Sequence, residues 1–168
     1  MKKRQVSSRT TLFMVQSALI AAVYVAVTLA VAPIAFGPVQ FRISEALAVL
    51  PCFTPAAVPG LFVGCLLANS LAGSIVPDVV FGSLATLIGA LASYGLRKHK
   101  FLVCVPPILS NVLIVPWVLH YGYGYPDAIP WLMLTVGIGE VLAVGGLGNL
   151  LLVALDRYKN VIFRSSAV

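Results

Sequence analysis

Charged side chains are scarce in this 168-residue chain: they make up 10% of it, and only five of them are acidic. Soluble domains carry about 25% charged residues. Together with a mean hydropathy of +1.02, this shortage excludes a soluble globular protein and indicates an integral membrane protein. Long polar stretches are also missing. We therefore find no segment for a soluble domain, and any ATP hydrolysis would have to come from a partner.

Cysteine and the motifs of enzyme chemistry are sparse as well. Cys52, Cys65 and Cys104 lie in apolar surroundings, without the Cys or His spacing of a disulfide framework or a zinc site. The sequence contains no nucleophile elbow and no phosphate-binding loop. We expect neither an enzyme nor a bound metal or cofactor.

Positive charge is present, but it is confined to the ends of apolar runs. The net charge of +6 comes mainly from basic clusters at 2–9, 97–100 and 157–164. Each cluster flanks an apolar segment, as the positive-inside rule expects, which predicts that both termini are cytoplasmic. The pattern indicates contact with membrane lipid and not with nucleic acid. The N-terminus has the order of a signal peptide, but its apolar run is longer than a usual signal core, so we interpret it as a retained helix.

The apolar runs predict an all-α integral membrane protein, a compact bundle of about six transmembrane helices in a single domain at 1–168. Proline, glycine and basic residues separate the runs. The expected helices are 10–32, 43–53, 56–72, 78–96, 101–121 and 128–158, with an outer loop at 33–40. Pro116 is expected to kink the fifth helix.

The stretch at 41–51 holds the chain's most informative pair of residues, Arg42 and Glu45, one helical turn apart. Its apolar run is about 18 Å long at helical rise, too short to cross a bilayer alone. Short or proline-interrupted hydrophobic segments are typical of transporter binding sites. The alternative is a surface ion pair at the membrane interface, which would contribute little.

Alanines recur every four residues along the first helix, at Ala18, Ala22 and Ala26. Residues with this spacing lie on one helical face. Small side chains on such a face let another helix approach closely in lipid. The partner is either another helix of the same chain or a different subunit.

Four further polar residues interrupt apolar helices: Asn69, Asp78, Asn111 and Glu140. Asn69 and Asp78 fall toward the outside, whereas Asn111 and Glu140 lie deeper. Glu140 is roughly 18 Å along its helix, near the bilayer middle, where a carboxylate is costly and by default functional. A structural hydrogen-bonding role is the alternative. These residues predict a pocket that opens outward.

Aromatic residues gather near the outer end of the fifth helix, Trp117 and Tyr121 among them. Rings at this level are typical of an interfacial belt. They also suit the face of a planar ligand, so both interpretations stay open.

The segment 36–47, which reads FGPVQFRISEAL and is followed by Leu50-Pro51, resembles the signature of the QueT family. That resemblance covers nearly the whole chain. It implies a substrate-binding S component of a bacterial energy-coupling factor (ECF) importer in the plasma membrane, with a queuosine precursor as its ligand. It also implies docking through the alanine face of the first helix onto a transmembrane coupling subunit that carries two ATPases.

The side chains suit the substrate class that the resemblance implies. A 7-deazaguanine presents an N–H and an amino group side by side, which one carboxylate accepts in bidentate fashion. A charged aminomethyl group would favour a second carboxylate, and amides suit the remaining edge. The residues alone do not decide which precursor binds. Two alternative functions also stay open: an S component for another vitamin or nucleobase, and a small structural or channel subunit.

Overall fold

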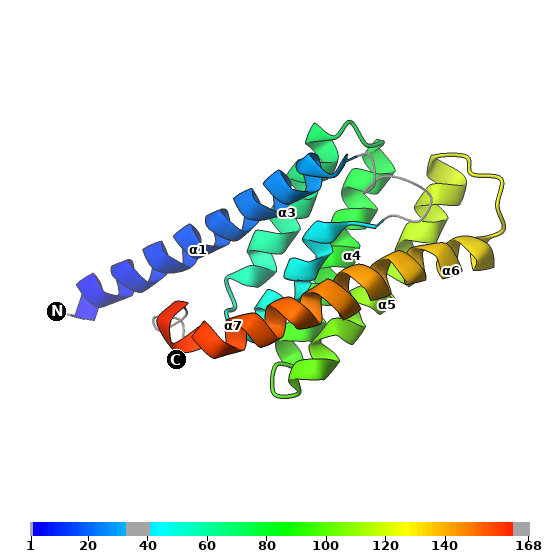
Figure 1. Ribbon diagram of the computed structural model, residues 1–168. Helices are drawn as coiled ribbons and strands as arrows, with labels where there is room; N and C mark the ends of the chain where they lie inside the picture. Colours follow the sequence, from blue (N-terminus) through cyan, green and yellow to red (C-terminus); the bar gives the residue numbers. More distant parts are fainter. Residues whose placement is uncertain (1, 33–40, 163–168) are drawn as a thin grey trace.

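The computed structural model describes residues 2–32 and 41–162, and within them every regular element is helical (Figure 1). Six continuous helical segments follow one another. They are α1 (Lys2–Ala30); η1 (Ile43–Cys52); α3 (Ala57–Leu71); α4 (Val76–Gly95); η2 (Lys100–Cys104) with α5 (Val105–Trp117) and η3 (Val118–Gly122); and α6 (Ile129–Glu140) with η4 (Val141–Gly148) and α7 (Asn149–Ile162). The all-α fold is thereby confirmed. The expected outer loop at 33–40 lies outside the described residues.

Four of these segments are long and apolar enough to cross a membrane: Arg9–Ala30, Val76–Gly95, Lys100–Gly122 and Ile129–Tyr158. The chain is therefore a multi-pass membrane protein. Two apolar helices are shorter, Ile43–Cys52 and Ala57–Leu71. The first was expected to be short. The second was expected at 56–72, which is one residue longer at each end than the helix observed. At a rise of about 1.5 Å per residue, α3 is roughly 22 Å long, less than the hydrocarbon core.

Prolines and glycines set the ends of the helices. A proline occupies the first turn of α4, α5 and α6, where the missing N–H costs nothing. Gly73, with φ of +76°, makes the turn between α3 and α4. Pro116 lies inside α5, and the wider π-helical turn η3 begins two residues later. The helical type therefore changes close to Pro116.

The short helix η1 is a 3₁₀ helix over its ten residues, with Pro51 inside it. Such helices rarely run beyond three or four residues, because their hydrogen-bond geometry is poorer. Here most of the helix is buried, and it contacts α1, α3, α4 and η4. Surrounding helices hold η1 in place, and its N-terminal end carries Arg42 and Glu45 into the interior.

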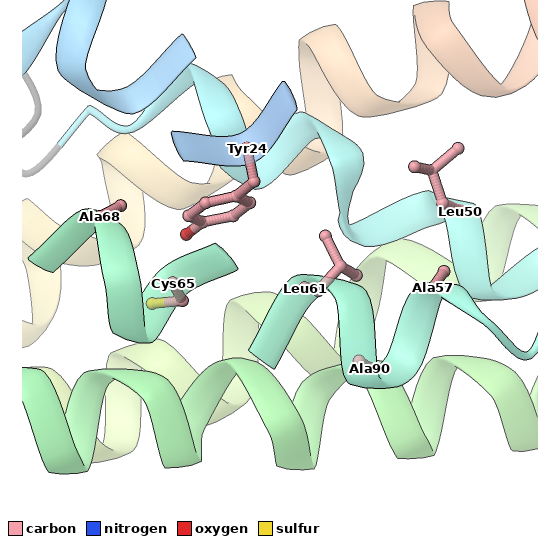
Figure 2. Close-up of a cluster of buried hydrophobic side chains, with 7 residues drawn as sticks. All are labelled: Tyr24, Leu50, Ala57, Leu61, Cys65, Ala68 and Ala90. Carbon is pink, nitrogen blue, oxygen red and sulfur yellow. The ribbon is translucent and has the colours of Figure 1, made fainter. Parts of the chain in front are cut away.

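The helix α1 packs against α3 through one face and leaves the opposite face uncovered. A Cβ at Gly60 would lie 2.8 Å from the Ser17 carbonyl oxygen, and one at Gly64 would lie 2.9 Å from the Tyr24 Cβ. The two backbones approach this closely only because α3 has glycine there. Figure 2 shows the resulting apolar cluster, in which Tyr24 joins residues of η1, α3 and α4.

The alanine face lies on the other side of α1. Ala18, Ala22 and Ala26 are all exposed. Within the described chain these alanines therefore do not serve as the packing surface between α1 and α3.

Candidate functional site

Six of the polar residues singled out in the sequence are buried, and together we call them the buried polar cluster. Their exposed fractions lie between 1% and 4%. They come from the start of η1 and from α3, α4, α5 and α6. The members are Arg42, Glu45, Asn69, Asp78, Asn111 and Glu140. Buried charges in a membrane protein are energetically costly, and those that occur are usually paired or functional.

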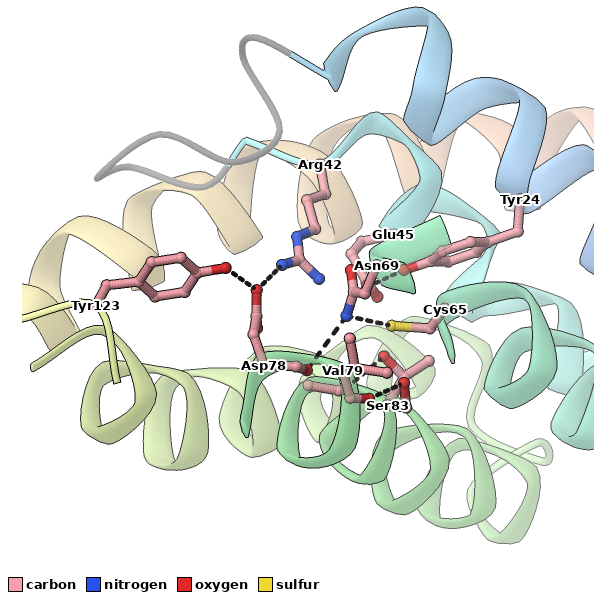
Figure 3. Close-up of polar contacts among 11 residues, drawn as sticks. Tyr24, Arg42, Glu45, Cys65, Asn69, Asp78, Val79, Ser83 and Tyr123 are labelled. Atoms are coloured by element: carbon pink, nitrogen blue, oxygen red, sulfur yellow. Dashed lines mark hydrogen bonds and ion pairs between the residues drawn. The ribbon is translucent and has the colours of Figure 1, made fainter. Parts of the chain in front are cut away.

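Arg42 and Asp78 form an ion pair within the cluster (Figure 3). The Arg42 Nη2 atom lies 3.6 Å from Asp78 Oδ2. The Tyr123 hydroxyl, from the segment between η3 and α6, donates to the same oxygen at 2.9 Å. Partial burial raises the pKa of the Tyr123 phenol, and the Asp78 carboxylate adds to that rise. The phenol therefore stays protonated at neutral pH and remains a donor to Asp78.

Asn69 links α3 to the start of α4 beside this pair. Its Nδ2 atom donates to the Asp78 carbonyl oxygen at 3.3 Å. Gly82 lies one turn further along α4. A Cβ at Gly82 would be 3.1 Å from Asp78 Oδ1 and 3.2 Å from Asn69 Nδ2. Glycine at this position thus leaves the side chains of Asp78 and Asn69 room that any larger residue would take.

Glu45 is held from α1. The Tyr24 hydroxyl donates to Glu45 Oε1 at 2.5 Å. One turn further along α1, the Thr28 hydroxyl donates to Ser44 Oγ at 2.6 Å. Two adjacent buried hydrogen bonds therefore fix the first turn of η1 against α1.

Glu140 lies at the junction of α6 and the π-helical segment η4. The side chains of Asn111, Glu45 and Arg42 lie near enough to its carboxyl to interact with it electrostatically. The sequence predicted Asn111 and Glu140 at similar depth on neighbouring helices, and α5 and α6 do contact each other. Glu140 and Glu45 therefore belong to one electrostatic unit, although they are far apart in the sequence.

Four buried oxygen atoms of the cluster have no hydrogen-bond partner within the described chain: Glu45 Oε2, Asn69 Oδ1, Asp78 Oδ1 and Glu140 Oε2. Buried polar atoms are nearly always hydrogen-bonded, so such a set needs an explanation. All four are acceptors. No group of three or more His, Cys, Asp or Glu side chains suited to a metal occurs among the described residues. The arrangement therefore suits a small molecule rich in N–H donors.

The model of the QueT transporter family matches residues 14–157. The chain belongs to this family. A QueT protein from Lactococcus lactis subsp. cremoris (strain MG1363), named a queuosine precursor transporter, is 37% identical over 73 residues. The match covers 42% of this chain and 43% of that relative, so it spans less than half of either. No solved structure matches the chain significantly.

Two predicted ligand contacts of this QueT-family chain lie apart from the buried polar cluster. Trp117 is 47% exposed and Tyr121 is 73% exposed. Their rings stack with centroids 6.1 Å apart, and they line an apolar groove that also includes Pro77 and Phe81. The structure therefore does not bring these rings together with the carboxylates, and their position suits an interfacial belt.

Other contacts of the site were missed in the sequence. Tyr24 contacts Glu45, and Thr28 contacts Ser44. Tyr123, which contacts Asp78, was not singled out from the other aromatic residues that follow the fifth helix. A signal was available for α1: Ser17, Ala21, Tyr24 and Thr28 recur at intervals of three and four residues. This spacing marks a second face of the helix, away from the alanine face.

Proposed function

We propose that this chain is the substrate-binding S component of an ECF-type importer, which captures a queuosine precursor of the 7-deazaguanine class outside the cell. The observation that carries the proposal is the set of four buried acceptor oxygens without a partner in the described chain. Family membership supports a transport role over catalysis. The name of the Lactococcus relative supplies the substrate class.

The donor edge of a deazaguanine complements these acceptors. Its ring N–H and amino group would meet the carboxylate of Glu45 or Glu140, as charge-assisted hydrogen bonds are the strong ones. Asn69 would accept from the remaining edge. Arg42 neutralises Asp78, so Glu45 and Glu140 are the carboxylates left to receive a ligand donor or a positively charged substituent.

The exposed alanine face supports docking onto another subunit. Ala18, Ala22 and Ala26 are exposed on a helix that has already buried its other face. In lipid, such a surface admits close approach of a further helix. We assign it to the transmembrane coupling subunit, which would connect the chain to two ATPases.

The orientation follows from the charge pattern. Cytoplasmic termini in a bacterial plasma membrane would place Arg42, Asp78 and Tyr123 at the outer side, above Glu140.

Direct binding to the purified full chain in lipid nanodiscs tests the proposal. Calorimetric titration with queuine, 7-cyano-7-deazaguanine and 7-aminomethyl-7-deazaguanine should show saturable binding of at least one, while thiamine and riboflavin should show none. Asp127 is an exposed acidic residue outside the cluster, so Asp127→Asn is a matched control that should bind like the wild type. Binding of a vitamin and of no deazaguanine would assign the chain to another substrate.

A further inference from the structure

Among the residues that the structure describes, Tyr24 is the aromatic side chain most completely enclosed by the apolar interior. It is 1% exposed and belongs to a cluster with Leu50, Leu61 and Cys65. Figure 2 shows its ring among these side chains, and Figure 3 shows its hydroxyl directed at Glu45. A buried tyrosine hydroxyl usually finds a partner. Here that partner is one oxygen of a carboxylate in the proposed binding site.

This hydrogen bond makes the two oxygens of Glu45 different. Oε1 accepts from Tyr24 at 2.5 Å, whereas Oε2 has no hydrogen-bond partner in the described chain. The packed ring fixes the position of the hydroxyl, and the hydroxyl fixes the rotation of the carboxylate. Glu45 therefore offers the interior a single acceptor in a defined direction.

We propose that Tyr24 is the positioning residue of the site: it holds Glu45 Oε1, so that Oε2 is the oxygen presented to the ligand's donor. The inference rests on the proposed function. Positioning of this kind increases affinity, because a side chain that is already oriented loses less conformational freedom when the ligand binds. Without the hydroxyl, Oε1 loses its hydrogen bond, and the ligand itself has to orient the carboxylate.

A neighbouring contact separates positioning from simple attachment of η1 to α1. Thr28 also joins the two helices, through Ser44, but it does not touch Glu45. Thr28→Val removes this contact with Ser44 and the contact of the Thr28 hydroxyl with the Tyr24 backbone carbonyl at 2.8 Å, but it keeps the hydrogen bond between the Tyr24 hydroxyl and Glu45. It is the matched control for Tyr24→Phe, which keeps the packed ring and removes only the hydroxyl.

The test is a double-mutant cycle on the full chain in nanodiscs, with whichever of the three deazaguanines binds the wild type. Tyr24→Phe should weaken binding at least fivefold, and Glu45→Gln at least tenfold. On the Glu45→Gln background, Tyr24→Phe should change the Kd less than twofold, because it acts only through Glu45. Thr28→Val should lower the melting temperature and leave the Kd within twofold.

Two results would overturn the positioning role of Tyr24 and leave the proposed function standing. One is an unchanged Kd for folded Tyr24→Phe. The other is a double variant whose fold-loss in affinity equals the product of the two single losses. If Tyr24→Phe does not fold, Glu45→Asp replaces it, since it keeps the charge and draws the carboxylate away from Tyr24. An unchanged Kd for Glu45→Asp would equally refute positioning. A wild-type chain that binds no deazaguanine would instead refute the proposed function, and the assignment of Tyr24 to that ligand would fall with it.

Discussion

Glu140 has one carboxylate oxygen that nothing in the described chain satisfies. It is 3% exposed and lies where two types of helix meet. A buried polar atom without a hydrogen-bond partner costs about 1–3 kcal/mol. This cost motivates the proposal that Glu140 contacts the bound ligand.

We predict that Glu140→Gln will weaken deazaguanine binding at least tenfold, or about 1.4 kcal/mol. The amide keeps the shape but places a donor opposite the ligand's own donors. The melting temperature should stay the same or rise, because a buried charge has been removed. Titration calorimetry and thermal unfolding measure both effects, with Asp127→Asn as the control for loss of a carboxylate.

The reverse pattern, intact binding with an unstable protein, would show that Glu140 is a structural member of a polar network. The binding site would then lie further out, at Glu45 and Asp78.

Members of the buried polar cluster were predictable where a polar residue stands out in an apolar helix. Asn69, Asn111 and Glu140 interrupt apolar helices, and a polar group in lipid is too expensive to be accidental. Tyr24 gave no such signal, because a tyrosine fits an apolar helix and its partner comes from another element. For Trp117 and Tyr121, an interfacial role and a ligand-binding role both call for aromatic residues at the end of a helix. The sequence therefore did not distinguish the two roles.

At the scale of elements, α1 has two faces with different tasks. One face packs on α3 through Gly60 and Gly64 and reaches the site through Tyr24. The other carries the exposed alanines. A bulky residue on the second face would leave the first intact.

We therefore predict that Ala22→Leu will abolish substrate uptake by cells that contain the complete importer, while the isolated protein binds its ligand with an unchanged Kd. The leucine side chain would hold the partner helix away. Ala92 is an exposed alanine on α4, and Ala92→Leu is the matched control that should retain uptake. Normal uptake by Ala22→Leu would refute the docking face.

The number of helices was predictable from the sequence, but the geometry of several was not. An apolar run with a proline gives the same signal for an α-helix and for the 3₁₀ helix η1, because only the surrounding contacts decide which is adopted. The π-helical segments η3 and η4 were invisible for the same reason. The spacing of apolar residues in the sequence indicates a helix, but it does not distinguish α, 3₁₀ and π geometry.

The whole molecule is an apolar bundle, and we found no nucleotide-binding motif in its sequence. We predict that liposomes containing only this chain will bind a deazaguanine without accumulating it, even with ATP inside. Addition of a compatible coupling subunit and its two ATPases should produce ATP-dependent accumulation, measured with radiolabelled ligand. Accumulation by the chain alone would contradict the S-component assignment and indicate an autonomous transporter.

The position of Tyr24 on α1 has a thermodynamic consequence. In the proposed function, the ligand binds on one side of this helix and the coupling subunit on the other, so the two binding equilibria would be linked through α1. A subunit that favours a conformation in which α1 has moved away from η1 must weaken ligand binding by some factor. Reciprocity then requires the loaded chain to bind that subunit more weakly by the same factor, and the single hydrogen bond between Tyr24 and Glu45 would help to set its size.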